Sequence, residues 1–325
     1  MPIIDVHNHF YPPAFVEALR AGAGALSVRD DAQGNPVLYS PGDANIAVRG
    51  HRDIGYREEV LDREGVDRQL ISLTTPGTLL EPPARSAALA RLVNDAFAEV
   101  MATRGDRFTA LATLPLNDAN ASVLEFERVI AAGFKGCMLF GNVNGTPLAD
   151  RRFWDLYQRA SDARAILYIH PTFPLGVDAM QEYWLMPMVG FLFDTTLAAA
   201  HLVYAGVPER FPGIRWVLGH LGGAIPFLAE RLDRGYEAFA ACRVNIPKPP
   251  SEYLRTFYYD TVNFDPKAIR LAVEFAGPGQ ILAGSDYPHQ IGSIPRMLQV
   301  IGGLDLPEPA KTDILGGNAA RLLGL

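Results

Sequence analysis

Two histidines stand two residues apart near the start of the chain, in the segment IIDVHNHF, residues 3–10. Side chains two positions apart point to the same face of a β-strand, whereas on a helix they would diverge by roughly 200°. Because the run before them is apolar, we interpret it as a strand that ends in His7 and His9. The two imidazoles are then predicted to converge on one point.

Other side chains with metal-binding or acid-base chemistry also follow short apolar runs. His170 ends the run LYIH, His220 stands in LGHLGG and Asp286 stands in GSDYPH. Imidazole nitrogen and carboxylate oxygen are the ligands of a zinc-like ion, and catalytic sites leave one coordination position open. We therefore predict one metal ion held by His7, His9, His170 and Asp286. Asp286 is also counted among the catalytic residues.

His220 is left over from this ligand set. A neutral imidazole beside a metal is suited to general acid-base catalysis near pH 7, which is the role we predict for it. The alternatives are a fifth metal ligand or a hydrogen-bonding partner of the ligands. Gly222 and Gly223 follow directly and would let a ligand approach the backbone, although a tight turn would use glycines too.

The remaining polar candidates are weaker. His201 lies in the helical pattern TLAAAHLVY and is expected to be structural, His51 has no strand-end position, and His289 is either a rim residue or a partner of the metal ligands. A two-metal site would commonly use a carboxylated lysine at the end of the fourth strand. Lys135 stands at the beginning of that strand, so a single metal ion is predicted.

Eight short β-rich runs alternate with segments of helical period along the whole chain. Two clear helical segments cover residues 89–101, with apolar residues at i, i+3, i+4 and i+7, and residues 117–133. Such alternation predicts a parallel sheet, and eight units predict a (β/α)8 TIM barrel whose strand ends gather the candidate residues on one rim. The alternative is a doubly wound sheet, which is disfavoured because no GxGxxG follows the first strand. The eight runs are PIIDVH, RQLISLT, FTALATL, KGCMLF, AILYIH, IRWVLGH, FYYDTV and QILAGSD.

The chain is predicted to form a single domain over residues 1–325, with a small insertion at about 22–55. That insertion is rich in Gly, Asp, Asn and Pro, and the segment DAQGNPVLY within it is typical of a hairpin. No internal repeat or low-complexity linker interrupts the pattern.

Composition restricts the partners and the cellular location. The 325 residues are 49% hydrophobic and 20% charged, with a formal net charge of -7, which argues against a nucleic-acid partner or an anionic membrane surface. Cys137 and Cys242 are far apart and suggest no disulfide. With no apolar run close to ~20 residues and no basic leader, a soluble cytoplasmic protein is expected.

The motifs DVHNHF, IHP, LGHLGGAIPFLAERLDR and GSDYPH, in this order, resemble the amidohydrolase-related family typified by aminocarboxymuconate-semialdehyde decarboxylase. The similarity covers nearly the whole chain. It implies a TIM barrel with one divalent metal ion at the four predicted ligands, and it matches His220 to the catalytic histidine of the family.

The resemblance also implies residues that bind substrate. Arg231 matches an arginine that reaches a substrate carboxylate from a partner subunit, so a homodimer is expected, and Arg49 and Arg52 are candidates for a second arginine. Some family members have Glu in place of the first histidine of HxH. Because this chain keeps His7, the resemblance favours Zn2+ over Mn2+ or Mg2+.

Two enzymatic functions fit these residues. The first is a metal-dependent, non-oxidative decarboxylase of a small unsaturated or aromatic carboxylic acid, and the alternative is a hydrolase or hydratase of the same superfamily. Aromatic substrates could stack on Phe10, Tyr11 or Trp184, although these side chains could equally pack in the core or a lid. A binding scaffold without activity is disfavoured, because the predicted metal keeps an open position.

Overall fold

The computed structural model describes residues 1–22, 24–40 and 43–325, so residues 23, 41 and 42 of the predicted insertion lie outside the described part. Parallel strands follow one another in chain order in two hydrogen-bonded sheets, β1-β5-β6 and β7-β8-β11-β12-β13-β14. Their bounds are β1 (Ile4–His9), β5 (Arg68–Ser72), β6 (Phe108–Ala110), β7 (Ala112–Thr113), β8 (Gly136–Phe140), β11 (Ile166–His170), β12 (Arg215–Leu218), β13 (Tyr258–Asp260) and β14 (Ile281–Leu282).

Two seams join these sheets into a closed barrel. At the first seam, β6 and β7 flank Leu111 and form one interrupted strand that pairs with β5 on one side and with β8 on the other. At the second seam, Val6 N donates to Ala283 O at 2.9 Å and His9 N donates to Tyr287 O at 2.8 Å. The predicted TIM barrel is confirmed, with the eight predicted runs as its strands.

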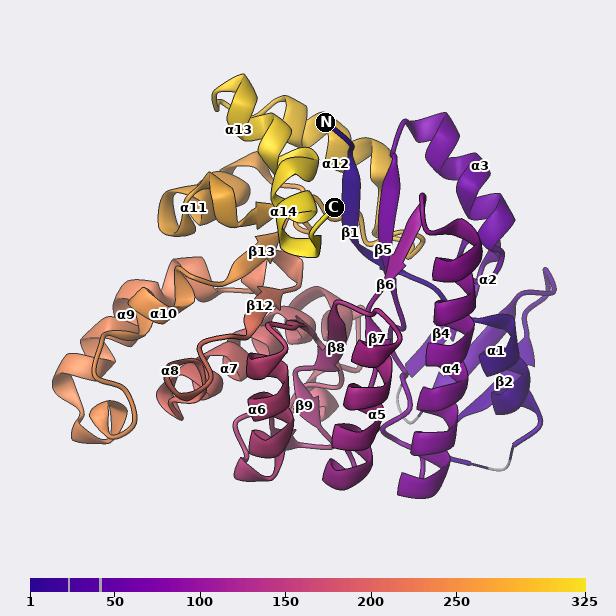
Figure 1. Ribbon diagram of the computed structural model, residues 1–325, viewed down its shortest axis with the longest axis horizontal. Coiled ribbons are helices and arrows are strands. Elements are labelled where there is room, and N and C mark those ends of the chain that lie inside the picture. Colours follow the sequence, from indigo (N-terminus) through magenta and orange to yellow (C-terminus); the bar gives the residue numbers. More distant parts are fainter. Residues whose placement is uncertain (23, 41–42) are drawn as a thin grey trace.

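Helices surround the barrel, because each strand is followed by a chain segment that returns outside it (Figure 1). The longer helices are α3 (Ile54–Glu64), α4 (Pro83–Arg104), α5 (Ala119–Ala131), α6 (Trp154–Asp162), α7 (Phe191–Tyr204), α9 (Ile225–Ala238), α11 (Pro266–Ala276) and α12 (Ile294–Gly302). Shorter helices are α1 (Pro13–Arg20), α2 (Arg49–Arg52), α8 (Val207–Arg210), α10 (Pro250–Leu254), α13 (Glu308–Thr312) and α14 (Asn318–Leu323).

The insertion after the first strand contains an antiparallel sheet of β2 (Ser27–Asp30), β3 (Pro36–Ser40) and β4 (Asp43–Ile46). The predicted hairpin is therefore extended by a third strand. This sheet lies beside α1 at one side of the barrel, at the lower right of Figure 1. The chain then returns to the barrel through α2, which brings residues 49–52 next to the end of β1.

The amino-terminal end of the barrel is closed. Arg215 at the start of β12 donates to the carbonyl oxygen of Leu322 in α14, and both chain termini lie at this end (Figure 1). Apolar side chains fill the barrel interior below the rim, and α14 packs against them. They include Ile4, Val6, Leu70, Leu111, Met138, Ile166, Val217, Leu282 and Leu322. The predicted site residues lie at the opposite end, where the carboxyl ends of the strands meet.

One continuous helical segment, Met186–Tyr204, is long and apolar enough to cross a membrane by length and composition, with 19 residues and a mean hydropathy of 1.4. No uninterrupted apolar run of this length was expected from the sequence, and Asp194 and His201 do interrupt this segment. Half of the segment is buried within the protein, and a core helix passes the same test. It is therefore weak evidence for a membrane segment.

Candidate metal centre

The predicted metal ligands meet at the carboxyl-terminal rim of the barrel. His7 and His9 lie on one face of β1, with ring centroids 5.0 Å apart, and the ring of His170 at the end of β11 is 5.3 Å from His7 and 4.9 Å from His9. Asp286 follows β14, and its Oδ1 atom is 3.2 Å from His9 Nε2 and 3.6 Å from His7 Nε2. All four side chains are buried.

Several of these polar atoms have no protein partner. His7 Nε2, His9 Nε2 and Asp286 Oδ1 are buried and make no hydrogen bond to any described residue. Buried nitrogen and oxygen atoms are normally satisfied, so an unsatisfied cluster needs an explanation. Imidazole nitrogens and a carboxylate oxygen converging in this way form the donor set of a zinc-like ion. The residues therefore fit a divalent metal.

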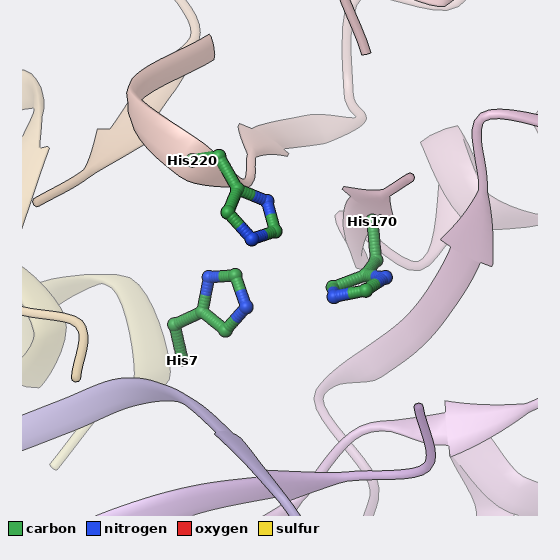
Figure 2. A group of neighbouring side chains, drawn as sticks. All are labelled: His7, His170 and His220. Carbon is green, nitrogen blue, oxygen red and sulfur yellow. The ribbon is translucent and has the colours of Figure 1, made fainter. Parts of the chain in front are cut away.

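His220 belongs to the same cluster. The ligand atoms of His7, His170 and His220 lie within 4.8 Å of one another, as do those of His7, His9 and Asp286. Figure 2 shows the three imidazoles of the first group facing a common space. His220 Nδ1 is buried without a hydrogen-bonding partner among the described residues. This position is compatible with both roles considered for His220, proton transfer and metal ligation.

A hydrogen bond indicates which nitrogen of His170 faces the centre. His170 Nδ1 lies 2.7 Å from Pro171 O and can donate to it, which leaves Nε2 free to ligate. Burial lowers the pKa of His9 and of His170, so both imidazoles stay neutral. Neutral imidazole is the form that binds metal.

Asp260, the last residue of β13, organises the centre from behind. Its Oδ2 atom lies 2.5 Å from His7 Nδ1 and accepts a hydrogen bond of 2.5 Å from Tyr168 Oη. The same carboxylate accepts from the backbone N–H groups of His220 and Leu221, each at 3.0 Å. Burial opposes its charge, but His7 and these hydrogen bonds lower the pKa of Asp260 to about 2. Burial by itself would lower the pKa of His7, but the negative charge of Asp260 opposes this effect, and the pKa of His7 is raised overall.

Asp260 therefore links a metal ligand to the candidate catalytic histidine. A carboxylate that accepts from the outer nitrogen of a metal-bound histidine fixes its tautomer and raises its basicity. The sequence analysis missed Asp260 and Tyr168. A usable signal existed for Asp260, because it ends the predicted seventh strand, FYYD, and strand ends supply barrel active sites.

Two site residues adopt left-handed backbone conformations. His220 has a φ of 52°, and Asp286 has a φ of 56°. Non-glycine residues rarely adopt such angles. These conformations persist where surrounding contacts impose them, often at functional sites. Here the contacts are the bond from His220 N to Asp260 and the 2.8 Å bond from Asp286 N to His7 O.

The two glycines after His220 have a packing role. A Cβ atom at Gly223 would lie 2.1 Å from Leu192 O, and one at Gly222 would lie 2.6 Å from the ring of Tyr259. Both also have positive φ angles. The turn thus requires glycine for its own packing, as the tight-turn alternative proposed.

Two further histidines extend the cluster beyond His9. The ring of His289 is 5.0 Å from that of His9 and 4.9 Å from that of His51. His51 is 1% exposed, and neither of its ring nitrogens has a hydrogen-bonding partner among the described residues. His201, by contrast, lies within α7 away from these contacts.

None of the predicted arginines forms a hydrogen bond or ion pair with a predicted metal ligand among the described residues. Arg49 forms a 2.8 Å ion pair with Asp53, the amino-terminal cap of α3, and Arg52 Nε donates to Ala47 O at 3.1 Å. His51, between them, faces inward instead. Arg231 on α9 is exposed and has no ion pair with a described residue, so the alternative of a pairing with Glu230 or Asp233 is absent here.

Trp184 borders a cavity of about 430 Å³ between β4 and the segment that follows β11. Its walls are Asp43, Ala44, Met180, Gln181, Tyr183, Trp184, Met186 and Pro187. Burial raises the pKa of Asp43, which lines this cavity, and the nearby charge of His289 lowers it by a smaller amount. Phe10 and Tyr11, the other aromatic candidates, are buried in the core.

The fourth strand agrees with the prediction of a single metal ion. β8 ends in Phe140, and Lys135 precedes the strand at its opposite end. Both potential ligand groups of the described residues also share His7. The binding of a single ion by these donor atoms stays a prediction.

Comparison with known proteins places this site in a family. The 2-amino-3-carboxymuconate-6-semialdehyde decarboxylase of Dictyostelium discoideum is 31% identical over 84% of this chain and 77% of its own length. The 6-methylsalicylic acid decarboxylase of Penicillium expansum is 29% identical over 99% of this chain and 96% of its own. The crystal structure of 5-carboxyvanillate decarboxylase from Sphingomonas paucimobilis superposes with a TM-score of 0.87 at 28% identity, covering 100% of this chain and 99% of that one. The sequence model of the Amidohydrolase family matches residues 4–325, and the chain belongs to that family.

Proposed function

We propose that this protein is a metal-dependent, non-oxidative decarboxylase of a small unsaturated or aromatic carboxylic acid. The observation that carries the proposal is the convergence of the unsatisfied atoms His7 Nε2, His9 Nε2 and Asp286 Oδ1 beside His170 and His220. The relatives described above are decarboxylases of a muconate semialdehyde, a methylsalicylate and a carboxyvanillate. Their substrates share a carboxylate next to a conjugated system.

His7, His9, His170 and Asp286 would hold one divalent ion, and we propose Zn2+ over Mn2+ or Mg2+ because histidine nitrogens outnumber carboxylate oxygens in the donor set. When bound, such an ion supplies positive charge that binds substrate oxygen and stabilises developing negative charge. Asp260 holds His7 in the orientation that this requires.

His220 would move the proton that the reaction needs. Decarboxylation breaks the bond between the carboxyl carbon and its neighbour, releases CO2 and leaves the electron pair on that neighbouring carbon, which must then take up one proton. Burial lowers the pKa of His220 to about 4, so its imidazole is neutral and can first accept the proton of the bound carboxylic acid. It then delivers this proton to the carbon. The bonds from Asp260 to the backbone of residues 220 and 221 hold the ring in place.

The substrate would enter through the cavity beside Trp184. Trp184 is 67% exposed and lies on its wall, where an aromatic ring could stack on the indole. Arg49 and Arg52 each use Nε for a bond within this chain, which leaves their terminal N–H groups for a substrate carboxylate, so both stay candidates. Arg231 from a second subunit remains the proposed carboxylate ligand.

We further propose that the protein is a homodimer. α7 and α9 lie side by side, linked by a 2.8 Å bond from Ala224 N to Thr196 Oγ1, and both present exposed aromatic side chains, including Phe193 and the 78% exposed Phe227. Exposed apolar surface of this kind is typical of protein interfaces. Arg231 follows Phe227 by one helical turn, so this interface would present its guanidinium to the partner. A cytoplasmic location is also proposed, from composition alone.

The decisive experiment is a substrate assay of the metal-loaded protein. Hydroxybenzoates and muconate semialdehydes are tested for CO2 release, and lactones are tested for acid release. We expect CO2 in equal amount to the decarboxylated product, with activity lost after chelation and regained with Zn2+ or Mn2+ at about one ion per chain. Acid release from lactones without CO2 from any carboxylic acid would instead favour the hydrolase alternative.

A further inference from the structure

His51 and His289 lie outside the predicted metal ligands and outside the proton transfer by His220, yet they adjoin the same centre. The ring of His220 is 4.8 Å from His7 and 5.3 Å from His170, whereas the ring of His289 is 5.0 Å from His9. The proton-transferring histidine and the pair His51–His289 therefore border different ligands. A substrate bound between them would be contacted on two sides.

The neighbouring elements hold His51 firmly in this position. Tyr11 stacks on its ring with centroids 5.2 Å apart and an interplanar angle of 26°. Arg57 is buried, donates to Gly50 O at 2.9 Å and to Asn8 Oδ1 at 2.7 Å, and also donates to the carbonyl oxygen of His9. These bonds tie α2 to the end of β1. His51 is thereby packed against His289, which in turn lies next to the predicted metal ligand His9.

Hydrogen-bonding chemistry at this pair is unused. A neutral imidazole offers one N–H donor and one acceptor lone pair, and the two rings lie with their centroids 4.9 Å apart. Both nitrogens of His51 lack partners among the described residues, although the side chain is 99% buried. His289 is only partly buried, and Asp43, which lines the cavity beside Trp184, lies within electrostatic reach of it.

We propose that His289, supported by His51, is the specificity-determining residue that hydrogen-bonds a hydroxyl substituent of the substrate, on the side of the metal centre away from His220. A hydroxyl group donates and accepts, as a neutral imidazole does, whereas a methyl group of similar size would leave the imidazole of His289 without this hydrogen bond. The proposal rests on the proposed function for the placement of an aromatic acid at the metal centre. It adds that the site selects substrates with a hydroxyl substituent on the ring.

A matched pair of ligands that cannot lose CO2 tests this subsite directly. 2-Nitroresorcinol and 3-methyl-2-nitrophenol differ by one hydroxyl against one methyl group, and the nitro group takes the place of the carboxylate. Binding to the metal-loaded protein is followed by absorbance, with each Kd corrected to the same ionisation state. The wild type should prefer the diol by ~10- to 100-fold, the usual effect of leaving a buried polar group unpaired.

His289→Leu should bring this ratio to about 1 by weakening diol binding, with unchanged metal content, and His289→Gln should restore part of the preference. His51→Phe keeps the stacking on Tyr11 and should lower the ratio ~3- to 10-fold. His201→Leu, a histidine substitution in α7, is the control and should leave the ratio at its wild-type value.

The proposal is overturned by a wild-type ratio near 1, by binding of neither probe, or by a ratio that survives His289→Leu. An unchanged ratio in His51→Phe would contradict the supporting role of His51. These outcomes differ from failure of the proposed function. A protein that releases no CO2 from any tested acid is not the proposed decarboxylase, but the expected binding ratios would still support the hydroxyl subsite at His289.

Discussion

At the scale of single residues, the two nitrogens of His7 have separate tasks. Nδ1 contacts Asp260, which also binds the backbone of His220, while Nε2 faces Asp286 without a hydrogen-bonding partner. One carboxylate thus orients both a metal ligand and the proposed acid-base residue. Substitutions at these positions should separate metal binding from proton transfer.

Replacement of His220 tests the proton transfer. His220→Ala should keep about one metal ion per chain and lose ~10²- to 10⁴-fold in kcat, the usual contribution of a general acid-base group. Metal analysis and steady-state kinetics on the same preparation measure both quantities. His201→Ala is the matched control and should remain fully active. A parallel loss of metal in His220→Ala would identify His220 as a ligand.

Replacement of Asp260 tests the support of the metal ligands. Asp260→Asn keeps the size of the side chain but removes the charge next to His7 Nδ1, and metal affinity should fall by ~10- to 100-fold. Competition with a chromogenic chelator gives the affinity. Asp265→Asn changes only an exposed helix cap and should leave affinity unchanged. Wild-type affinity in Asp260→Asn would show that Asp260 does not act through His7.

At the scale of elements, α7 holds the loops beside the site through one buried carboxylate. Asp194 accepts from Thr172 N and from Asn142 Nδ2, each at 2.9 Å, and so joins α7 to the chain after β11 and to β9 (Asn142–Val143). Burial raises the pKa of Asp194 from 3.8 to about 6. The folded protein therefore binds this proton more tightly than the unfolded chain does.

This shift predicts a pH dependence of stability. Because the pKa of Asp194 is higher in the folded protein than in the unfolded chain, proton binding by Asp194 stabilises the folded state at low pH. This stabilisation is fully present below the unfolded pKa of 3.8 and is lost as the pH rises through about 6. Between pH 4 and 7, Asp194→Asn should gain up to ~3 kcal/mol relative to wild type. Urea unfolding of both proteins across this range measures the difference. A constant difference at every pH would mean that Asp194 titrates normally.

At the scale of the whole molecule, the barrel has one closed and one open end. α14 covers the amino-terminal end, whereas the insertion strand β4 and the segment before α7 border the mouth. Arg231 stands on the outer surface, eleven positions after His220. A helix rises ~1.5 Å per residue, so α9 carries this residue on the order of 10 Å away from its own rim. This distance supports the proposal that Arg231 completes a site in a neighbouring subunit.

Mixed dimers test this arrangement. Arg231→Ala and His220→Ala proteins, each nearly inactive, are mixed, dissociated and reassociated. If the arginine acts across the interface, each heterodimer contains one site with both lesions and one intact site, so it should recover about half of the wild-type activity. Sedimentation and mass spectrometry verify the subunit exchange. Exchange without recovery, or an active monomer, would reduce Arg231 to a surface charge.

The sequence by itself determined the strands and the positions of the rim residues. The alternation of faces along a strand places His7 with His9, and a closed parallel barrel brings every strand end to one rim, so residues 170, 220 and 286 join them from local patterns alone. Only the tertiary structure revealed that His51 rather than Arg49 or Arg52 faces inward, and that Asp260 joins His7 to His220. These contacts depend on how α2 packs against Tyr11 and Arg57 and on the register of β13, which are set by long-range packing that no local sequence period encodes.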